Sequence, residues 1–238
     1  MSKVKVLLVD DHELVREGIK MILEKERGFE VVGEATDGRK ALAALQEVTP
    51  DVILMDISMP NLNGFEAIFQ IKRSYPDAKI LVLTVHTNEE YVYKSLKAGA
   101  LGYLVKDSAV SELVGAVKAI SEGKSYLSPS VSKGLVDRLT NPTEMATESS
   151  PYELLTPRER EILQLIGEGK NYQQIADTLN ISYKTVENHR ANIAEKLGVR
   201  QRAQLVRYAI DMGLVSEDSR GNFEKTKGEK NKGGKIEK

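Results

Sequence analysis

The length and composition of this chain favour two compact, soluble units. It has 238 residues, of which 41% are hydrophobic and 29% charged, with a formal net charge of −1 and no cysteine. These values exclude a disulfide scaffold, a thiolate metal site and a cysteine nucleophile, and no apolar run reaches the roughly 18 residues of a membrane span. We expect a cytoplasmic protein without a signal peptide or a membrane partner.

The first half of the chain alternates short apolar runs with segments of helical periodicity. Strands are expected at residues 4–10, 29–35, 51–56, 78–85 and 102–106. Apolar residues recur at helical spacing after each strand, and the last of these helices is expected to end at Gly123, a residue that commonly caps helices. The alternation predicts an α/β domain with a doubly wound (βα)5 parallel sheet.

The composition changes after Gly123. Residues 125–152 are rich in Ser, Thr, Pro and Glu, which predicts a linker, within which residues 133–139 could form a short helix. The pattern from Leu154 onward is helical, and the last residues are polar and rich in lysine. We therefore predict four segments: a domain over 1–124, a linker over 125–152, an all-α domain over 153–215 and a disordered basic tail over 216–238.

Polar residues stand at four strand ends of the first domain. Asp10 and Asp11 end the first strand, Asp56 the third and Lys106 the fifth, while Thr84 lies near the end of the fourth. These ends share one edge of a parallel sheet, so the side chains should converge. Crowded carboxylates repel one another unless a cation joins them, and oxygen ligands suit magnesium or manganese. One carboxylate could then act as a nucleophile toward a phosphoryl group.

A single aspartate at a strand end is more often a helix cap or a turn residue than a ligand. The agreement of four strand ends favours a shared site here.

The all-α domain begins with a helix start signal. Thr156 can cap a helix, Pro157 suits its first position and Glu159 completes a capping box. Two short helices follow, joined by a turn at Asn180 and Ile181, and the second has a polar outward face. This is typical of a helix-turn-helix, whose second helix enters the DNA major groove, although a solvated helix face is the alternative. The predicted DNA-contacting residues are Lys184, Thr185, Glu187, Asn188, Arg190, Ala191, Asn192, Arg200 and Arg202.

Four motifs of the first domain together resemble the receiver domain of two-component response regulators. They are the acidic pair at 10–11, MDISMPNLNG around Asp56, LTV with Thr84 and GYLVKD with Lys106. The resemblance implies a flavodoxin-like fold with Asp56 as phosphoacceptor and Tyr103 as a switch aromatic. It also implies that Thr84 and Lys106 contact the phosphoryl group and that Mg²⁺ or Mn²⁺ is bound by Asp10, Asp11 and Asp56.

This sequence departs from the receiver pattern at Asp107, where many receivers have proline after the lysine. In the family, the positions of Ser58 and His86 tune how fast the aspartyl phosphate hydrolyses.

The second half resembles the LuxR-type helix-turn-helix through LTPREREIL, IA and TVENHRANIAEKLGV. Its pairing with a receiver is the organisation of NarL/FixJ-type response regulators. The resemblance implies a transcription regulator rather than an enzyme, with a sensor histidine kinase and double-stranded DNA as partners, homodimers when phosphorylated, and RNA polymerase as a candidate further partner. Glu187 departs from the pattern, since many relatives have lysine there.

Two other functions stay open at this point. A metal-dependent phosphohydrolase would also use an aspartyl nucleophile, but it needs a general acid, and Ser58 stands where many such enzymes have aspartate. A phosphorylation-independent adaptor would use the helical domain to bind protein.

Overall fold

The computed structural model describes residues 2–132 and 151–215. The chain divides into two compact units, Met1–Glu148 and Ser149–Lys238. The predicted tail, the helix suggested at 133–139 and most of the predicted linker lie outside the described residues, so the four segment boundaries stay predictions. Within the described ranges, no helix is both long enough and apolar enough to cross a membrane.

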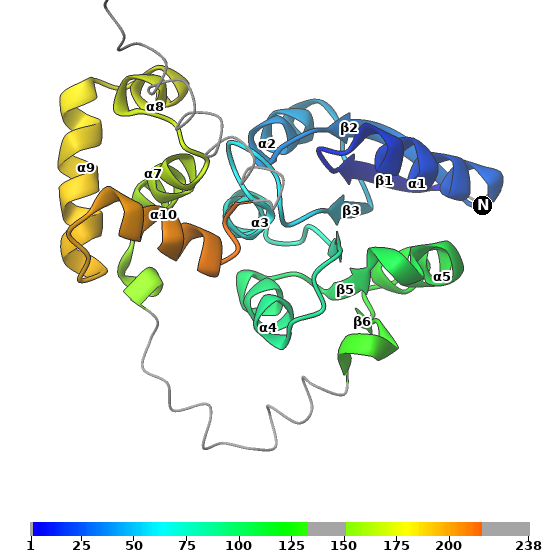
Figure 1. Cartoon of the computed structure of the whole chain (residues 1–238). Coiled ribbons are helices and arrows are strands. Elements are labelled where there is room, and N and C mark those ends of the chain that lie inside the picture. The colour runs from blue at the N-terminus through cyan, green and yellow to red at the C-terminus, as the bar shows by residue number, and fades with distance from the viewer. Residues whose placement is uncertain (1, 133–150, 216–238) are drawn as a thin grey trace, which may run out of the picture. The chain divides into compact units, whose positions relative to one another are not determined.

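The first unit is a parallel sheet with helices on both faces (Figure 1). Its strands are β1 (Val4–Val9), β2 (Phe29–Ala35), β3 (Val52–Met55), β4 (Ile80–Thr84), β5 (Gly102–Val105) and β6 (Tyr126–Leu127). Its helices are α1 (Glu13–Lys25), α2 (Gly38–Glu47), α3 (Gly64–Ser74), α4 (Glu89–Ala98) and α5 (Ala109–Ser121). The strand order is β2-β1-β3-β4-β5-β6, with every pairing parallel, which confirms the predicted doubly wound architecture.

Alternate positions along each strand supply two separate cores, because successive strand side chains point to opposite faces of a sheet. On one face, strand residues such as Leu7 and Ile53 pack against α2, α3 and α4. On the other face, residues such as Val6 and Leu54 pack against α1 and α5. The sheet is therefore covered on both sides, which buries β3 along its whole length and leads the chain directly to Asp56 at the strand's carboxyl end.

The sheet has one strand more than the sequence predicts. β6 pairs with β5, with Gly102 opposite Tyr126 and Tyr103 opposite Leu127, and it lies in the segment predicted as linker. Ser128 follows it in a fully buried position and donates its backbone N–H to the carbonyl of Tyr103 at 2.9 Å. A strand of two residues is too short to show periodicity, so only its pairing with β5 reveals it.

The second unit is helical throughout the described residues 151–215. After the short 3₁₀ helix η3 (Pro151–Leu154) come α7 (Pro157–Gly167), α8 (Tyr172–Leu179), α9 (Tyr183–Lys196) and α10 (Arg202–Asp211). Thr156 and Glu159 form the predicted capping box, Asn180 turns the chain in the left-handed conformation, and Ser182 accepts a hydrogen bond from the backbone of Thr185. These local signals confirm the four-helix arrangement, with α8 and α9 as the helix-turn-helix pair.

Candidate functional site

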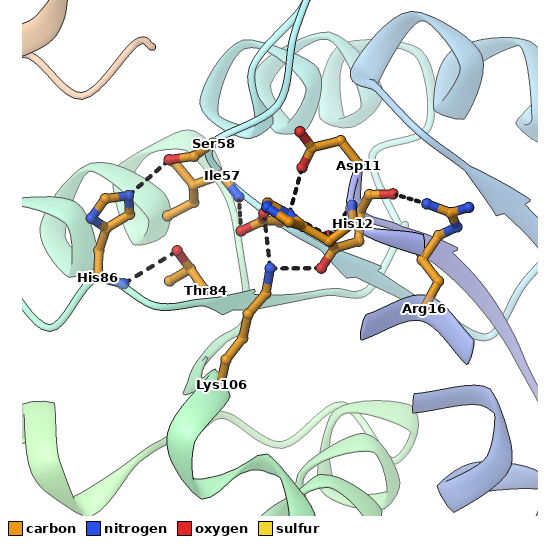
Figure 2. A network of polar contacts seen from close by, with 10 residues as sticks. Asp11, His12, Arg16, Ile57, Ser58, Thr84, His86 and Lys106 are labelled. Atoms are coloured by element: carbon orange, nitrogen blue, oxygen red, sulfur yellow. Dashed lines mark hydrogen bonds and ion pairs between the residues drawn. The ribbon is translucent and has the colours of Figure 1, made fainter. Parts of the chain in front are cut away.

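The predicted carboxylates converge at the carboxyl edge of the sheet (Figure 2). Asp10 and Asp11 follow β1, Asp56 follows β3, and these strands are neighbours. One ligand atom from each of the three, together with one from His12, all lie within 4.8 Å of one another. Asp10 and Asp56 are each only 3% exposed, so their charges depend on protein partners rather than on water.

Lys106 supplies a charge that offsets these acids. It stands in the 3₁₀ helix η1 (Lys106–Ser108) directly after β5, and its Nζ lies 2.7 Å from Asp10 Oδ2 and 3.0 Å from Asp56 Oδ2. Burial lowers the pKa of Lys106, but Asp56 and Asp10 outweigh burial and raise that pKa above its ordinary value. Lys106 is therefore charged near neutral pH and joins the two strand ends.

The backbone holds Asp56 rigidly. Its N–H donates to the carbonyl of Val9 at 2.8 Å, and its Oδ1 accepts from the N–H of Ile57 at 2.7 Å. Gly64, at the start of α3, passes so close that a Cβ there would lie 2.1 Å from the carbonyl oxygen of Asp56. Burial raises the pKa of Asp56 above its ordinary value, although Lys106 opposes this shift. The carboxyl thus sits in a buried, closely packed setting next to one cation.

Asp11 and His12 form the more open side of the cluster. His12 Nδ1 lies 3.0 Å from Asp11 Oδ1 and 3.3 Å from Asp10 Oδ1. Burial lowers the pKa of His12, but Asp11 and Asp10 outweigh burial and raise it. Burial also raises the pKa of Asp11, against the opposing charge of His12. The sequence predictions do not include His12, yet its place directly after the acidic pair is the signal that could have found it.

The donor set fits a hard divalent cation. Asp10 Oδ2 and Asp11 Oδ1 are buried oxygens, and their partners are Lys106 Nζ at 2.7 Å and His12 Nδ1 at 3.0 Å respectively. Three carboxylates in one cluster are the oxygen-rich ligands that Mg²⁺ prefers. The cluster formed by Asp10, Asp11 and Asp56 is compatible with magnesium binding.

Thr84 and Tyr103 both contact His86, which lies in the loop between β4 and α4. Thr84 is fully buried, and its Oγ1 accepts the backbone N–H of His86 at 3.4 Å. Tyr103 is fully buried as well, and its hydroxyl donates to the carbonyl oxygen of His86 at 2.9 Å. Burial raises the pKa of the Tyr103 hydroxyl far above its ordinary value. The predicted switch aromatic therefore points inward and stays protonated.

The His86 ring ties this loop to the phosphoacceptor side of the cluster. Its Nε2 lies 2.7 Å from the Oγ of Ser58, two residues after Asp56, and Figure 2 shows Ser58, His86 and Thr84 grouped on one side of Lys106. The same ring stacks on Tyr91 of α4, with centroids 4.2 Å apart. Ser58 and His86, at the two positions predicted to tune hydrolysis, thus contact each other directly.

The predicted DNA-contacting residues fall into two groups by exposure. The exposed group consists of Lys184, Asn188, Ala191, Asn192 and Arg200, and the half-buried group of Thr185, Glu187, Arg190 and Arg202. Lys184 Nζ lies 3.1 Å from Glu187 Oε2, so the acid that departs from the family pattern is paired within its own helix.

Several of the half-buried residues already hold the fold together. The Thr185 hydroxyl lies 2.8 Å from the hydroxyl of the capping Ser182. Arg190 donates from Nη2 to the carbonyl of Arg200 at 2.9 Å. Arg202 donates to the carbonyl of Lys170 at 2.6 Å, and its guanidinium lies 5.4 Å from the ring centre of Tyr172. Arg202 thus joins α10 to the start of α8, a structural task that its sequence position did not reveal.

Comparisons with known proteins cover both units. The sequence-family model for the response regulator receiver domain matches residues 6–118, and the family model for bacterial regulatory proteins of the luxR family matches residues 153–209. The transcriptional regulatory protein DegU of Brevibacillus brevis is 42% identical over 226 residues, which span 90% of this chain and 96% of DegU. LiaR of Bacillus subtilis is 44% identical over 213 residues, which span 90% of this chain and all of LiaR.

Solved structures agree with this assignment. RcsB from Salmonella enterica serovar Typhimurium, solved with promoter P1flhDC and the phosphomimetic BeF3⁻, has a TM-score of 0.55 at 31% identity, covering 87% of this chain and 98% of RcsB. A LuxR-family response regulator from Aurantimonas has a TM-score of 0.57 at 36% identity, covering 59% of this chain and 100% of that chain. Neither the phosphohydrolase nor the adaptor gains support from these relatives. The chain belongs to the two-component response regulators that join a receiver domain to a LuxR-type DNA-binding domain, a family of transcriptional regulators rather than enzymes.

Proposed function

We propose that Asp56 accepts a phosphoryl group from a sensor histidine kinase in a magnesium-dependent reaction, and that this event switches DNA binding by the helical unit. One observation carries the proposal: Lys106 Nζ lies between the carboxylates of Asp10 and Asp56, 2.7 and 3.0 Å away, at the carboxyl edge of the sheet. That arrangement combines an acidic cluster, a nucleophile and a movable cation in one place.

Each residue of the site has a separate task in this scheme. Asp10, Asp11 and Asp56 would hold Mg²⁺ or Mn²⁺, which when bound supplies positive charge to phosphoryl oxygens. An oxygen of Asp56 attacks phosphorus, and the bond from phosphorus to the donor's imidazole nitrogen breaks. In the structure Lys106 pairs with two carboxylates, and its flexible stem would let it turn to the new phosphoryl oxygens.

Thr84 and Tyr103 would transmit the change. A phosphoryl group that draws the Thr84 hydroxyl also disturbs the backbone of His86, which holds the Tyr103 hydroxyl. The His86 ring extends the effect to α4 through Tyr91. The phosphoryl group then shifts a two-state equilibrium by contacting one state better than the other.

The exposed face of α9 would contact the DNA major groove. Lys184 and Glu187 form a pair with no net charge, which reduces the repulsion between the Glu187 carboxylate and DNA phosphates. A carboxylate there can accept from the exocyclic amino group of cytosine, while Arg200 and Arg190 would contact phosphates. Solved RcsB dimers bind DNA, which supports the homodimer that we propose for this chain when Asp56 is phosphorylated. RNA polymerase stays a candidate further partner, and a cytoplasmic location would give the chain access to DNA.

The labelling experiment tests the phosphoacceptor directly. The full chain is incubated with Mg²⁺ and a small-molecule phosphodonor, and the mass gain is measured by intact mass spectrometry with peptide mapping. Wild-type protein should gain one phosphoryl group on the peptide that contains Asp56, and Asp56→Asn should gain none. Equal labelling of both proteins would refute the proposal.

A further inference from the structure

We infer that Arg16 is a positioning residue for the acidic turn at residues 10–11, which carries two of the three clustered carboxylates. The inference deepens the proposed function, because it concerns the metal affinity of the same site. Arg16 donates a hydrogen bond to the backbone of the turn and not to its carboxylates, so it is neither a metal ligand nor a direct partner of a ligand carboxylate.

The contacts of Arg16 join three elements. It lies on α1, and its Nη1 donates to the backbone carbonyl of Asp10, just beyond the end of β1, at 2.8 Å. Its Nε lies 3.5 Å from Oε2 of Glu34, which belongs to β2. The Arg16 side chain is only 13% exposed, and Figure 2 shows it reaching the acidic turn from the side opposite Ser58 and His86.

The carbonyl of Asp10 needs this donor. Apolar side chains surround the small space next to Asp10 and Arg16, among them the buried Ile19, Leu54 and Leu83. A backbone carbonyl that loses its partner in such surroundings finds a replacement only if water enters or the turn rotates. Rotation of the Asp10 peptide would swing the Asp10 and Asp11 side chains out of their present arrangement.

The placement of Arg16 is electrostatically unfavourable without these partners. It is the fourth residue of α1, close to the positive end of the helix dipole, where basic residues are disfavoured. Glu34 and the carbonyl of Asp10 offset that cost. If Arg16 served only to link α1 to β2, its ion pair with Glu34 would be enough. Lys20 already provides such a pair, since its Nζ lies 2.9 Å from Glu34 Oε1.

Lys20 therefore provides a matched control. It shares helix α1 and the partner Glu34 with Arg16, but its hydrogen bond and ion pair are with Glu34 and not with the acidic turn. Arg16→Met removes the contact to Asp10 and the ion pair, whereas Lys20→Met removes an ion pair alone. Arg16→Lys keeps the charge but offers a single nitrogen for two partners.

The experiment measures Mn²⁺ binding to the full chain by electron paramagnetic resonance of the free ion. Thermal unfolding without metal is measured in parallel. Residues that orient metal ligands typically change affinity by about 10- to 100-fold, so Arg16→Met should bind Mn²⁺ roughly tenfold more weakly, with Arg16→Lys in between and Lys20→Met like wild type.

Two results with the variants would overturn the inference: unchanged Mn²⁺ affinity in folded Arg16→Met, or an equal loss in Lys20→Met, which would indicate general docking of α1. If Arg16→Met does not fold, Arg16→Lys decides by the same comparison. A wild-type chain that binds no Mn²⁺ overturns this inference and the metal assignment, while labelling of Asp56 tests the phosphoacceptor separately.

Discussion

The acidic site of the first unit and the α9 surface of the second place their functional groups in contrasting ways. Asp10, Asp56 and Lys106 come from three strand ends, are largely buried, and contact one another across the sheet. Lys184, which is exposed, and Glu187, which is half-buried, come from one helix and contact each other within that helix. The first arrangement depends on the whole fold, whereas the second can change by substitution without disturbing a core.

The two regions should therefore respond differently to amino-acid substitution. A change at the acidic site alters packing, charge balance and chemistry together, because its residues are coupled. A substitution on α9 should alter DNA binding but have little effect on stability, because ion pairs at the surface contribute only about 0 to 1 kcal/mol to the free energy of unfolding. We therefore expect the chemistry to be shared with relatives and the DNA target to be particular to this chain.

The largest effect on stability is expected from Gly64→Ala, which tests whether the acidic site depends on tight packing around Asp56. The new Cβ would lie 2.1 Å from the carbonyl oxygen of Asp56 and 2.8 Å from the Cα of Ile57, so backbone must move. We expect a loss of about 3 kcal/mol in the free energy of unfolding, measured by urea denaturation.

Gly115→Ala in α5 is the matched control, because a Cβ there meets nothing within 4 Å. Replacing an exposed helical glycine should stabilise the chain by up to about 1 kcal/mol. Destabilisation of both variants to the same extent would contradict the packing argument.

Lys106→Met tests whether one cation couples the strand ends to the chemistry. Asp10 and Asp56 would lose their shared partner, and phosphoryl oxygens would lose a positive charge. By analogy with the removal of one stabilising donor from an active site, the initial rate of Asp56 labelling should fall about 100-fold. Lys118→Met, on the exposed surface of α5, should label at the wild-type rate. A Lys106→Met rate close to wild type would show that the lysine only balances charge.

Glu187→Lys tests whether the α9 surface can change its DNA binding without a loss of stability. The substitution replaces the paired acid with a base, so binding to duplex DNA should strengthen and its dependence on salt should steepen by about one unit of slope for each phosphate gained. The unfolding free energy should change by less than about 0.5 kcal/mol. Fluorescence anisotropy at several salt concentrations measures the first effect and urea denaturation the second.

Arg202→Met is the contrasting variant, since Arg202 donates to the carbonyl of Lys170 and its guanidinium lies over the ring of Tyr172. We expect it to destabilise the helical unit. If Glu187→Lys destabilised the chain as much as Arg202→Met, the contrast between an adjustable surface and a structural contact would be wrong.

The smallest effect is a pH dependence confined to the helical unit. Burial raises the pKa of Glu159, but hydrogen bonds from Lys196 and from the backbone of Thr156 outweigh burial and hold that pKa below its ordinary value of 4.5. The resulting stability is fully present above about pH 4.5 and is lost as pH falls through the lower pKa of the folded state.

Glu159→Gln should therefore reduce the protection of α7 amides from hydrogen exchange by roughly 1 kcal/mol at pH 7, and the difference from wild type should shrink in acid. Glu195→Gln, exposed on α9, is the control. A difference that grew toward low pH would have the wrong sign for this mechanism.

The sequence by itself determined the features that depend on neighbouring residues. Strand and helix alternation, the Thr156 capping box and the Ser182 cap follow from short-range patterns, and the structure confirms them. The strand-end positions of Asp10, Asp56 and Lys106 were also predictable, because parallel sheets bring carboxyl ends of strands to one edge.

Only the tertiary structure decided the contacts between segments distant in sequence. β6 exists because β5 offers an unpaired edge, and Ser58 meets His86 because two loops from neighbouring strands converge. Arg16 reaches Asp10, and Arg202 reaches Lys170, across turns whose geometry no periodicity describes. The physical reason is that local spacing sets which face of an element is buried, while side-chain partners depend on how packed elements are placed in three dimensions.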